Sequence, residues 1–192
     1  LDRGRSWTAF GGLPTVAVDD LKIHPETGNL VVATHGRSLY VIDDVSPLAA
    51  VMAEERRKDA WLFPPRPAFG AYRLPGWSEW NGKAFFRGEN PPEGALLTWW
   101  LREFTGDEVR ISITNEKDVP IATLKVAGTP GFGRVAWSLH PIREGDRERG
   151  GGLFGPQPRF VPPGEYTVTL THGQTKVKQK LMVRIAEGID TR

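Results

Sequence analysis

Hydrophobic and polar positions alternate along most of the chain between residues 60 and 185. Each predicted strand there has one apolar face, and the positions between are largely Thr, Ser, Lys and Arg. Short strands of this kind, separated by turn residues, predict an antiparallel β-sandwich. The apolar sets are Ala95, Leu97, Trp99 and Leu101; Val109, Ile111 and Ile113; Ala122, Leu124 and Val126; Val135, Trp137 and Leu139; Tyr166, Val168 and Leu170; and Val177, Leu181, Val183 and Ile185.

Residues 21–44 have a different pattern, with three short strands at close spacing. "LKIHP" turns through "ETGN" into "LVVAT", and "HGR" turns into "SLYVIDD". Because "LVVA" and "LYVI" are apolar at successive positions, both faces of these strands need cover. Three short strands do not supply that cover themselves. We therefore expect an external partner, either the rest of a larger protein or a second copy of this chain.

A helix and an extended segment are predicted between these two regions. Ser46 fits an N-cap and Pro47 a first helical position, and good helix formers follow as far as residue 59. The next stretch, "WLFPPRPAFGAY", is rich in proline and predicts an extended strap that leads into the sandwich.

The first residues, "LDRGRSW", have the composition of a tight hairpin turn. In this turn the carboxylate of Asp2 accepts backbone hydrogen bonds, Gly4 takes a positive φ, and Trp7 lies back across the turn, with Ser6 between them. We expect backbone N–H groups to use the Asp2 carboxylate fully, so that it binds no metal. A turn without a preceding strand also indicates an internal piece of something longer.

Composition narrows the possible functions. The chain has 22 Gly and 16 Pro among 192 residues, which suits a turn-rich β protein. It has no Cys, which excludes disulfides and Cys-ligated zinc, and no apolar run long enough to span a bilayer. A net charge of +2 is too small to indicate nucleic acid as a partner. Lys176, Lys178, Lys180 and Arg184 alternate with other residues, as on the wet face of a strand.

Two stretches of the sequence resemble a known family. "DRGRSW" resembles the Asp-box, or BNR repeat, without its first Ser or Thr. The ordered series "VDDLKIHPETGNLVVATHGRSLYVIDDVSPL", "LFPPRP", "GENPPEGALLTWWL", "GFGRVAWSL" and "VPPGEYTVTL" resembles the C-terminal end of bacterial sortilin-like, BNR-repeat "glycosyl hydrolase" β-propeller proteins. In those proteins the last blade is followed by a short helix and an Ig- or fibronectin-like sandwich.

The resemblance implies an all-β fold with four parts. Residues 1–45 would be a terminal blade fragment with its Asp-box, 46–59 a connecting helix, 60–186 an Ig- or fibronectin III-like sandwich, and 187–192 a tail. In the family, the fourth strand of the closing blade is commonly supplied from the other end of the propeller. The family resemblance also implies a periplasmic or secreted location.

The family name suggests glycoside hydrolysis, which needs two carboxylates at a set separation. The candidate acids are the doublets Asp19–Asp20 and Asp43–Asp44, together with Glu89. Neighbours in a strand point to opposite faces, so neither doublet can serve one sugar. We expect these acids to cap strand ends and tie turns. In relatives that hydrolyse xyloglucan the catalytic acids lie in other blades, so no catalytic residue is assigned here.

Two further groups are candidates for ligand binding. In "THGRS", His35 and Arg37 flank a glycine turn, where Arg37 could bind an acidic group and His35 act as acid or base. The alternative, which we favour, is a plain glycine turn whose arginine bonds to carbonyls or to an Asp doublet. Trp77 and Trp80 lie in a polar loop, where they could stack on sugar rings or seal a domain interface. We favour the interface.

Three hypotheses follow. The first is a non-catalytic structural or interaction segment of a propeller protein, without cofactor or metal. The second is a carbohydrate-binding module of a secreted glycosidase, with polysaccharide as its ligand. The third is a fragment of an active glycoside hydrolase with its catalytic acids upstream.

Overall fold

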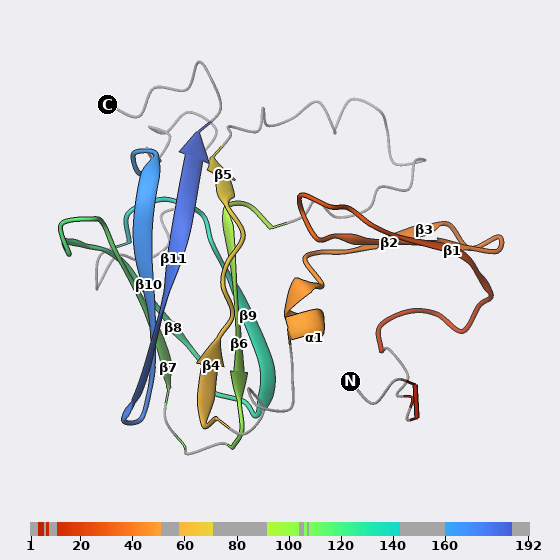
Figure 1. The fold of residues 1–192 in the computed structure, drawn as a ribbon, viewed down its shortest axis with the longest axis horizontal. Helices are drawn as coiled ribbons and strands as arrows, with labels where there is room; N and C mark the ends of the chain where they lie inside the picture. The colour runs from red at the N-terminus through yellow and green to blue at the C-terminus, as the bar shows by residue number, and fades with distance from the viewer. Residues whose placement is uncertain are drawn as a thin grey trace, which may run out of the picture. The chain divides into compact units, whose positions relative to one another are not determined.

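The computed structural model describes residues 4, 5, 7, 11–50, 58–70, 92–103, 106, 108–142 and 160–185. The expectations for Asp2, Ser6, Trp77, Trp80 and Glu89 therefore lie outside the described residues. The chain divides into two units, Leu1–Lys58 and Asp59–Arg192. The described parts are all-β apart from the short helix α1 (Ser46–Ala50), as Figure 1 shows.

Unit 1 contains one antiparallel sheet of three strands. They are β1 (Val18–Ile23), β2 (Leu30–Thr34) and β3 (Leu39–Ile42), with β2 in the middle. The turn before β3 has Gly36 at φ 74° and Ser38 at φ 72°. The prediction of three closely spaced antiparallel strands is confirmed, although β1 begins before Leu21.

Both faces of the unit 1 sheet carry exposed apolar side chains. The register pairs Leu21 with Val32 and Tyr40 on one face, and Ala33 with Leu39 on the other. Leu21 and Ile23 are 55% and 62% exposed on the first face, and Leu39 and Val41 are 65% and 58% exposed on the second. Val32, at the centre, is buried. Large apolar side chains on both faces of this sheet therefore remain more than half exposed.

The helix begins where the sequence predicts. The Asp44 carboxylate accepts hydrogen bonds from the Ser46 N–H (3.2 Å) and hydroxyl (2.5 Å), which fixes the start of α1. The Asp44 N–H in turn donates to the Asn29 side chain at 3.0 Å. The predicted extent of the helix beyond Ala50 lies outside the described residues.

Unit 2 consists of two sheets with one core between them. One has the strand order β5-β11-β10-β7-β8 and the other β4-β6-β9, drawn as two layers in Figure 1. The strands are β4 (Ala60–Leu62), β5 (Ala68–Gly70), β6 (Ala95–Leu101), β7 (Val109–Thr114), β8 (Pro120–Val126), β9 (Gly131–Trp137), β10 (Gly164–His172) and β11 (Thr175–Ile185).

The predicted apolar faces form this core. Leu97, Ile111, Leu170 and Leu181 are completely buried, and Leu124, Val126, Val135, Val177 and Ile185 are partly buried against them. Trp99 requires a glycine opposite it, since a Cβ on its cross-strand partner Gly133 would overlap the indole ring. The alternation in the sequence therefore identified the inward faces of both sheets.

The segment predicted to be a strap contributes a strand to each sheet instead. β4 pairs antiparallel with β6, and β5 pairs parallel with β11. Pro64, Pro65 and Pro67 lie between β4 and β5 and have no N–H to donate to a ladder, so pairing stops there and the chain crosses to the other sheet.

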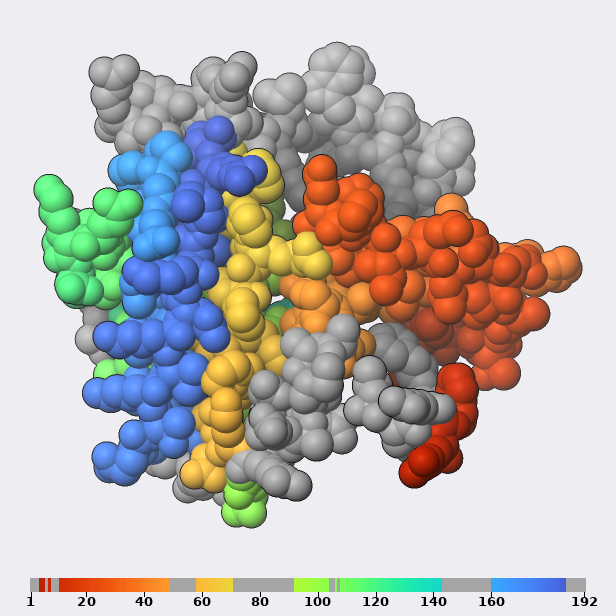
Figure 2. Space-filling model, viewed as in Figure 1, coloured from red at the N-terminus to blue at the C-terminus, as the bar shows by residue number. Residues whose placement is uncertain are grey.

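β10 and β11 form a hairpin, with His172 opposite Thr175 and Gly173 at φ 55° in the turn. In Figure 2 the β11 side chains lie between those of β10 and those of the β4–β5 segment. Lys176, Lys178, Lys180 and Arg184 are exposed along β11, as predicted for the wet face of a strand.

Candidate functional site

The turn after β2 carries two of the predicted site residues. The backbone N–H of His35 donates to the carbonyl of Ala17 at 2.9 Å. The His35 Nδ1 lies 3.4 Å from an Asp19 carboxylate oxygen, and these side chains are 81% and 57% exposed. Arg37 is exposed at the tip of the same turn. We expected Arg37 to bond to backbone carbonyls or to an Asp doublet, and the side chain that contacts Asp19 is His35.

An exposed His–Asp pair is a weak catalytic device, because water screens the charge of both groups. The pair also has a structural role, since it joins the start of β1 to the end of β2. His35 and Arg37 therefore share one turn. The contacts described for His35, to Ala17 and Asp19, connect this turn to the start of β1.

The Asp doublets also serve local structure. Asp19 lies at an irregularity of β1, where the register shifts between Val18 and Asp20. Asp44 is buried and holds Ser46, as described above. The prediction of turn-tying acids is confirmed for Asp44, whereas Asp19 and Asp20 lie within a strand and not at its end.

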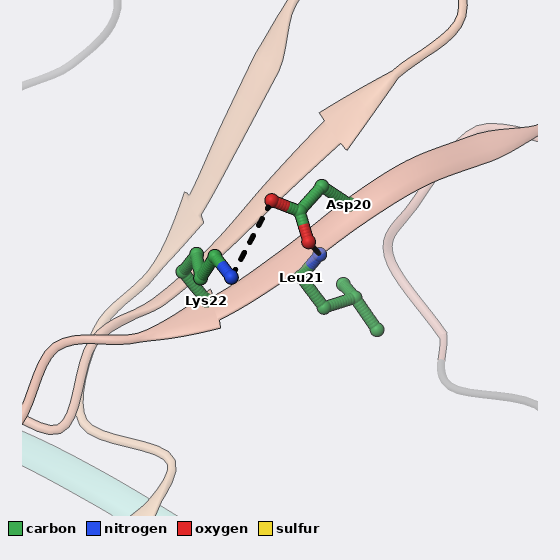
Figure 3. Close-up of polar contacts among 3 residues, drawn as sticks. All are labelled: Asp20, Leu21 and Lys22. Carbon is green, nitrogen blue, oxygen red and sulfur yellow. Dashed lines mark hydrogen bonds and ion pairs between the residues drawn. The ribbon is translucent and has the colours of Figure 1, made fainter.

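The Asp20 side chain forms a hydrogen bond to the backbone of its own strand. Its carboxylate accepts a hydrogen bond from the Leu21 N–H at 2.8 Å and lies 3.8 Å from the Lys22 ammonium, as Figure 3 shows. The bond to Leu21 engages a donor that a neighbouring strand would otherwise use. This contact was not foreseen from the sequence, because it depends on β1 extending back through Asp20.

The described residues of the first turn, Gly4 and Trp7, match the predicted geometry. Gly4 has φ 82°, and the Trp7 Nε1–H donates to the Gly4 carbonyl at 3.0 Å. Trp7 is nevertheless 89% exposed, so its ring closes this turn without being buried.

An aromatic row crosses the outer face of the three-stranded sheet in unit 2. Trp61, Trp100 and Phe132 are partners across β4, β6 and β9. The Trp100 and Phe132 rings meet edge to face, with centroids 5.3 Å apart and planes at 74°, and Phe63 stacks on Phe132 at 5.8 Å. Arg134 lies beside the row and donates to the Thr98 hydroxyl at 2.9 Å. The sequence analysis did not bring these three aromatic residues together.

A polar hollow lies on the outer face of the five-stranded sheet. It has a volume of about 350 Å³ and is lined by Asp118, Thr167, Lys178, Gln179 and Lys180. The Lys180 ammonium lies 2.8 Å from Glu165, and this hydrogen bond and charge raise the pKa of Lys180. Lys178, Lys180 and Asp118 are exposed, whereas Thr167 and Gln179 are half-buried.

Within the described ranges, no three His, Asp or Glu side chains are placed to hold a metal ion. No helix among the described residues is both long and apolar enough to cross a membrane.

Comparison with known proteins identifies no relative. The sequence matches no family model, and searches of curated proteins and of solved structures found no match either.

Proposed function

We propose that this chain is a non-catalytic, C-terminal structural and interaction segment of a bacterial sortilin-like, BNR-repeat propeller protein that acts outside the cytoplasm. In this proposal unit 1 belongs to the last blade, and unit 2 is an Ig- or fibronectin III-like sandwich. The observation that carries it is the unit 1 sheet, a three-stranded meander with exposed apolar side chains on both faces.

Such a sheet suits a blade better than an independent layer. A soluble sheet on its own needs at least one polar face, whereas a blade is packed between two neighbours. Leu21 and Ile23 would contact one neighbouring blade, and Leu39 and Val41 the other. The remainder of the propeller is therefore the proposed partner of unit 1.

The strand order of unit 2 supports the finer fold assignment. In Ig nomenclature, β4-β6-β9 would be strands A, B and E, and β5-β11-β10-β7-β8 would be A′, G, F, C and C′. Near the start of β10, the Tyr166 hydroxyl donates to the Pro162 carbonyl at 2.7 Å. This resembles the tyrosine corner found at the corresponding strand of Ig-like sandwiches.

The non-catalytic part of the proposal is supported by the local roles of the acids. Asp19 contacts His35, Asp20 holds the Leu21 N–H, and Asp44 holds Ser46. A glycosidase instead needs two carboxylates that face one sugar across a cleft.

Two measurements test the proposal. The gene should be sequenced on the 5′ side of the Leu1 codon, where we expect further Asp-box repeats in frame. Purified protein should also be assayed with chromogenic polysaccharides, and we expect no release of dye above a buffer control. A coding region that starts at Leu1, or turnover by this chain, would contradict the proposal.

A carbohydrate-binding module is the second candidate, and the aromatic row of Trp61, Trp100 and Phe132 is what favours it. Against it stands the 74° angle between two of these rings, since a sugar platform needs coplanar faces. Glycan-array binding by the native chain that is lost in Phe132→Ala would establish this second function. Phe132 is suited to this test because its side chain is 39% exposed.

A further inference from the structure

Among the described residues, no strand pairs with the outer edge of β3. The Thr34 N–H donates to the Ser38 carbonyl at 3.3 Å, and alternate residues of an antiparallel pair bond in the same direction. Tyr40 and Ile42 therefore direct their backbone groups toward β2. The N–H and C=O groups of Leu39 and Val41 point away from the sheet.

The opposite edge of the sheet is partly closed. The His24 N–H donates to Asn29 and its carbonyl accepts from Gly28, so by the same alternation the Leu21 and Ile23 backbone groups point outward from β1. The Leu21 N–H is occupied by Asp20, and Lys22 places a second charge on this strand (Figure 3). Charged side chains and occupied donors are the usual devices that prevent pairing at an edge.

The β3 edge carries none of these devices among its own four residues. "LYVI" contains no charge and no proline, and the two residues with outward backbone groups also have exposed apolar side chains, Leu39 and Val41. An apolar edge without charge or proline favours strand addition.

We propose that a second copy of this chain pairs with the β3 edge, antiparallel and about a two-fold axis at Tyr40. In that register Leu39 of each copy lies opposite Val41 of the other, and all the outward groups of both residues form hydrogen bonds. Shifting the register by two residues in either direction replaces these two pairs within β3 by a single one, Val41 with Val41 or Leu39 with Leu39. The result is a continuous six-stranded sheet with β1 at both ends, where its edge is protected.

Charges at the ends of β3 fit the same register. Arg37 precedes the strand and Asp43 follows it, so the antiparallel arrangement brings Arg37 of each copy to the end where Asp43 of the other lies. A two-fold axis repeats the pair, giving two opposite-charge contacts per dimer. This complementarity is what favours a second copy over an unrelated strand as the occupant. The inference goes beyond the proposed function, because it rests on this edge and not on a parent protein.

The position of Tyr40 provides a direct test. It lies opposite itself, in a non-hydrogen-bonded pair, where Cα atoms are about 4.5 Å apart and a disulfide is sterically allowed. Since the chain has no cysteine, Tyr40→Cys introduces a single thiol. We expect the oxidised variant to run as a covalent dimer on a non-reducing gel. Ile23→Cys, exposed on the β1 edge, is the matched control and should remain largely monomeric.

The non-covalent dimer is tested by light scattering on the unmodified 192-residue chain. We expect a concentration-dependent dimer that is lost in Val41→Lys and kept in Ile23→Lys. Arg37→Asp and Asp43→Arg should each weaken it, and the double variant should restore it, because the swap rebuilds both pairs. Circular dichroism of each variant separates loss of pairing from loss of folding.

Three outcomes would overturn the inference. The first is a chain that stays monomeric up to millimolar concentration. The second is equal cross-linking of Tyr40→Cys and Ile23→Cys. The third is a dimer that survives Val41→Lys, which would place the interface on another surface.

Discussion

Single side chains fix the corners of unit 2. Tyr166 joins β10 to the preceding segment through its bond to Pro162, and its ring meets the buried Trp137 ring edge to face at 5.9 Å. Burial, and secondarily the charge of Glu116, raise the pKa of the Tyr166 hydroxyl. The sequence placed Tyr166 in the core, but the hydroxyl bond depends on a backbone path that no periodicity specifies.

Tyr166→Phe tests this bond and its pH dependence. The folded state keeps the phenol proton to higher pH than the unfolded state, so it binds more protons above the ordinary tyrosine pKa of about 10. The free energy of unfolding therefore falls as pH rises from about 10 through the folded pKa. We expect Tyr166→Phe to lower it by about 1 kcal/mol at pH 7. The variant should lose less stability than the native chain above pH 10, as measured by urea unfolding at each pH. A parallel decline in both proteins would contradict the assignment.

Whole elements show where sequence patterns succeed and where they fail. Alternation located β6, β7, β10 and β11 and their inward faces, because one side of each meets a core. β4 and β5 were missed, since three residues are too few for a period and the prolines between them suggested an unpaired segment. The His35–Asp19 contact was missed for a similar reason, because it depends on where β1 begins and on its register shift.

One side chain ties β4 to the other sheet. The Gln179 amide on β11 donates to the Leu62 carbonyl at 3.0 Å, and both residues are at least partly buried. We expect Gln179→Ala to lower the free energy of unfolding of unit 2 by about 1 kcal/mol. Lys178→Ala is the matched control, because Lys178 is the exposed neighbour on the same strand and should change stability little. Chemical denaturation followed by tryptophan fluorescence measures the free energy of unfolding of both variants. An equal loss in the two variants would contradict a stabilising role for the Gln179–Leu62 hydrogen bond.

At the scale of the whole molecule, apolar burial is divided unequally between the two units. The core cluster lies entirely between Ala60 and Val183, whereas Val32 and Pro47 are the buried apolar side chains among the described residues of unit 1. Stability should therefore be divided in the same way, because burial of apolar surface is the main favourable term in folding.

Separating the units tests this division. We expect residues 59–192 alone to unfold in one cooperative transition, and residues 1–58 alone to show none. A three-stranded sheet with little buried surface does not offset its loss of conformational entropy. Thermal circular dichroism and amide proton dispersion distinguish the two outcomes. A cooperative transition in residues 1–58 would show that unit 1 has a core of its own.

The parallel pairing of β5 with β11 has a mechanical consequence. Ala68, Phe69 and Gly70 pair with Val183, Arg184 and Ile185, and both strands run in the same direction. A pulling force that enters through the chain before β5 and leaves through the chain after β11 draws the two strands in opposite directions along their length. Such a force loads all hydrogen bonds of the pair together, in shear, and cannot open them one after another. Tension applied between β5 and β11 is thus resisted by all the hydrogen bonds of this pair at once.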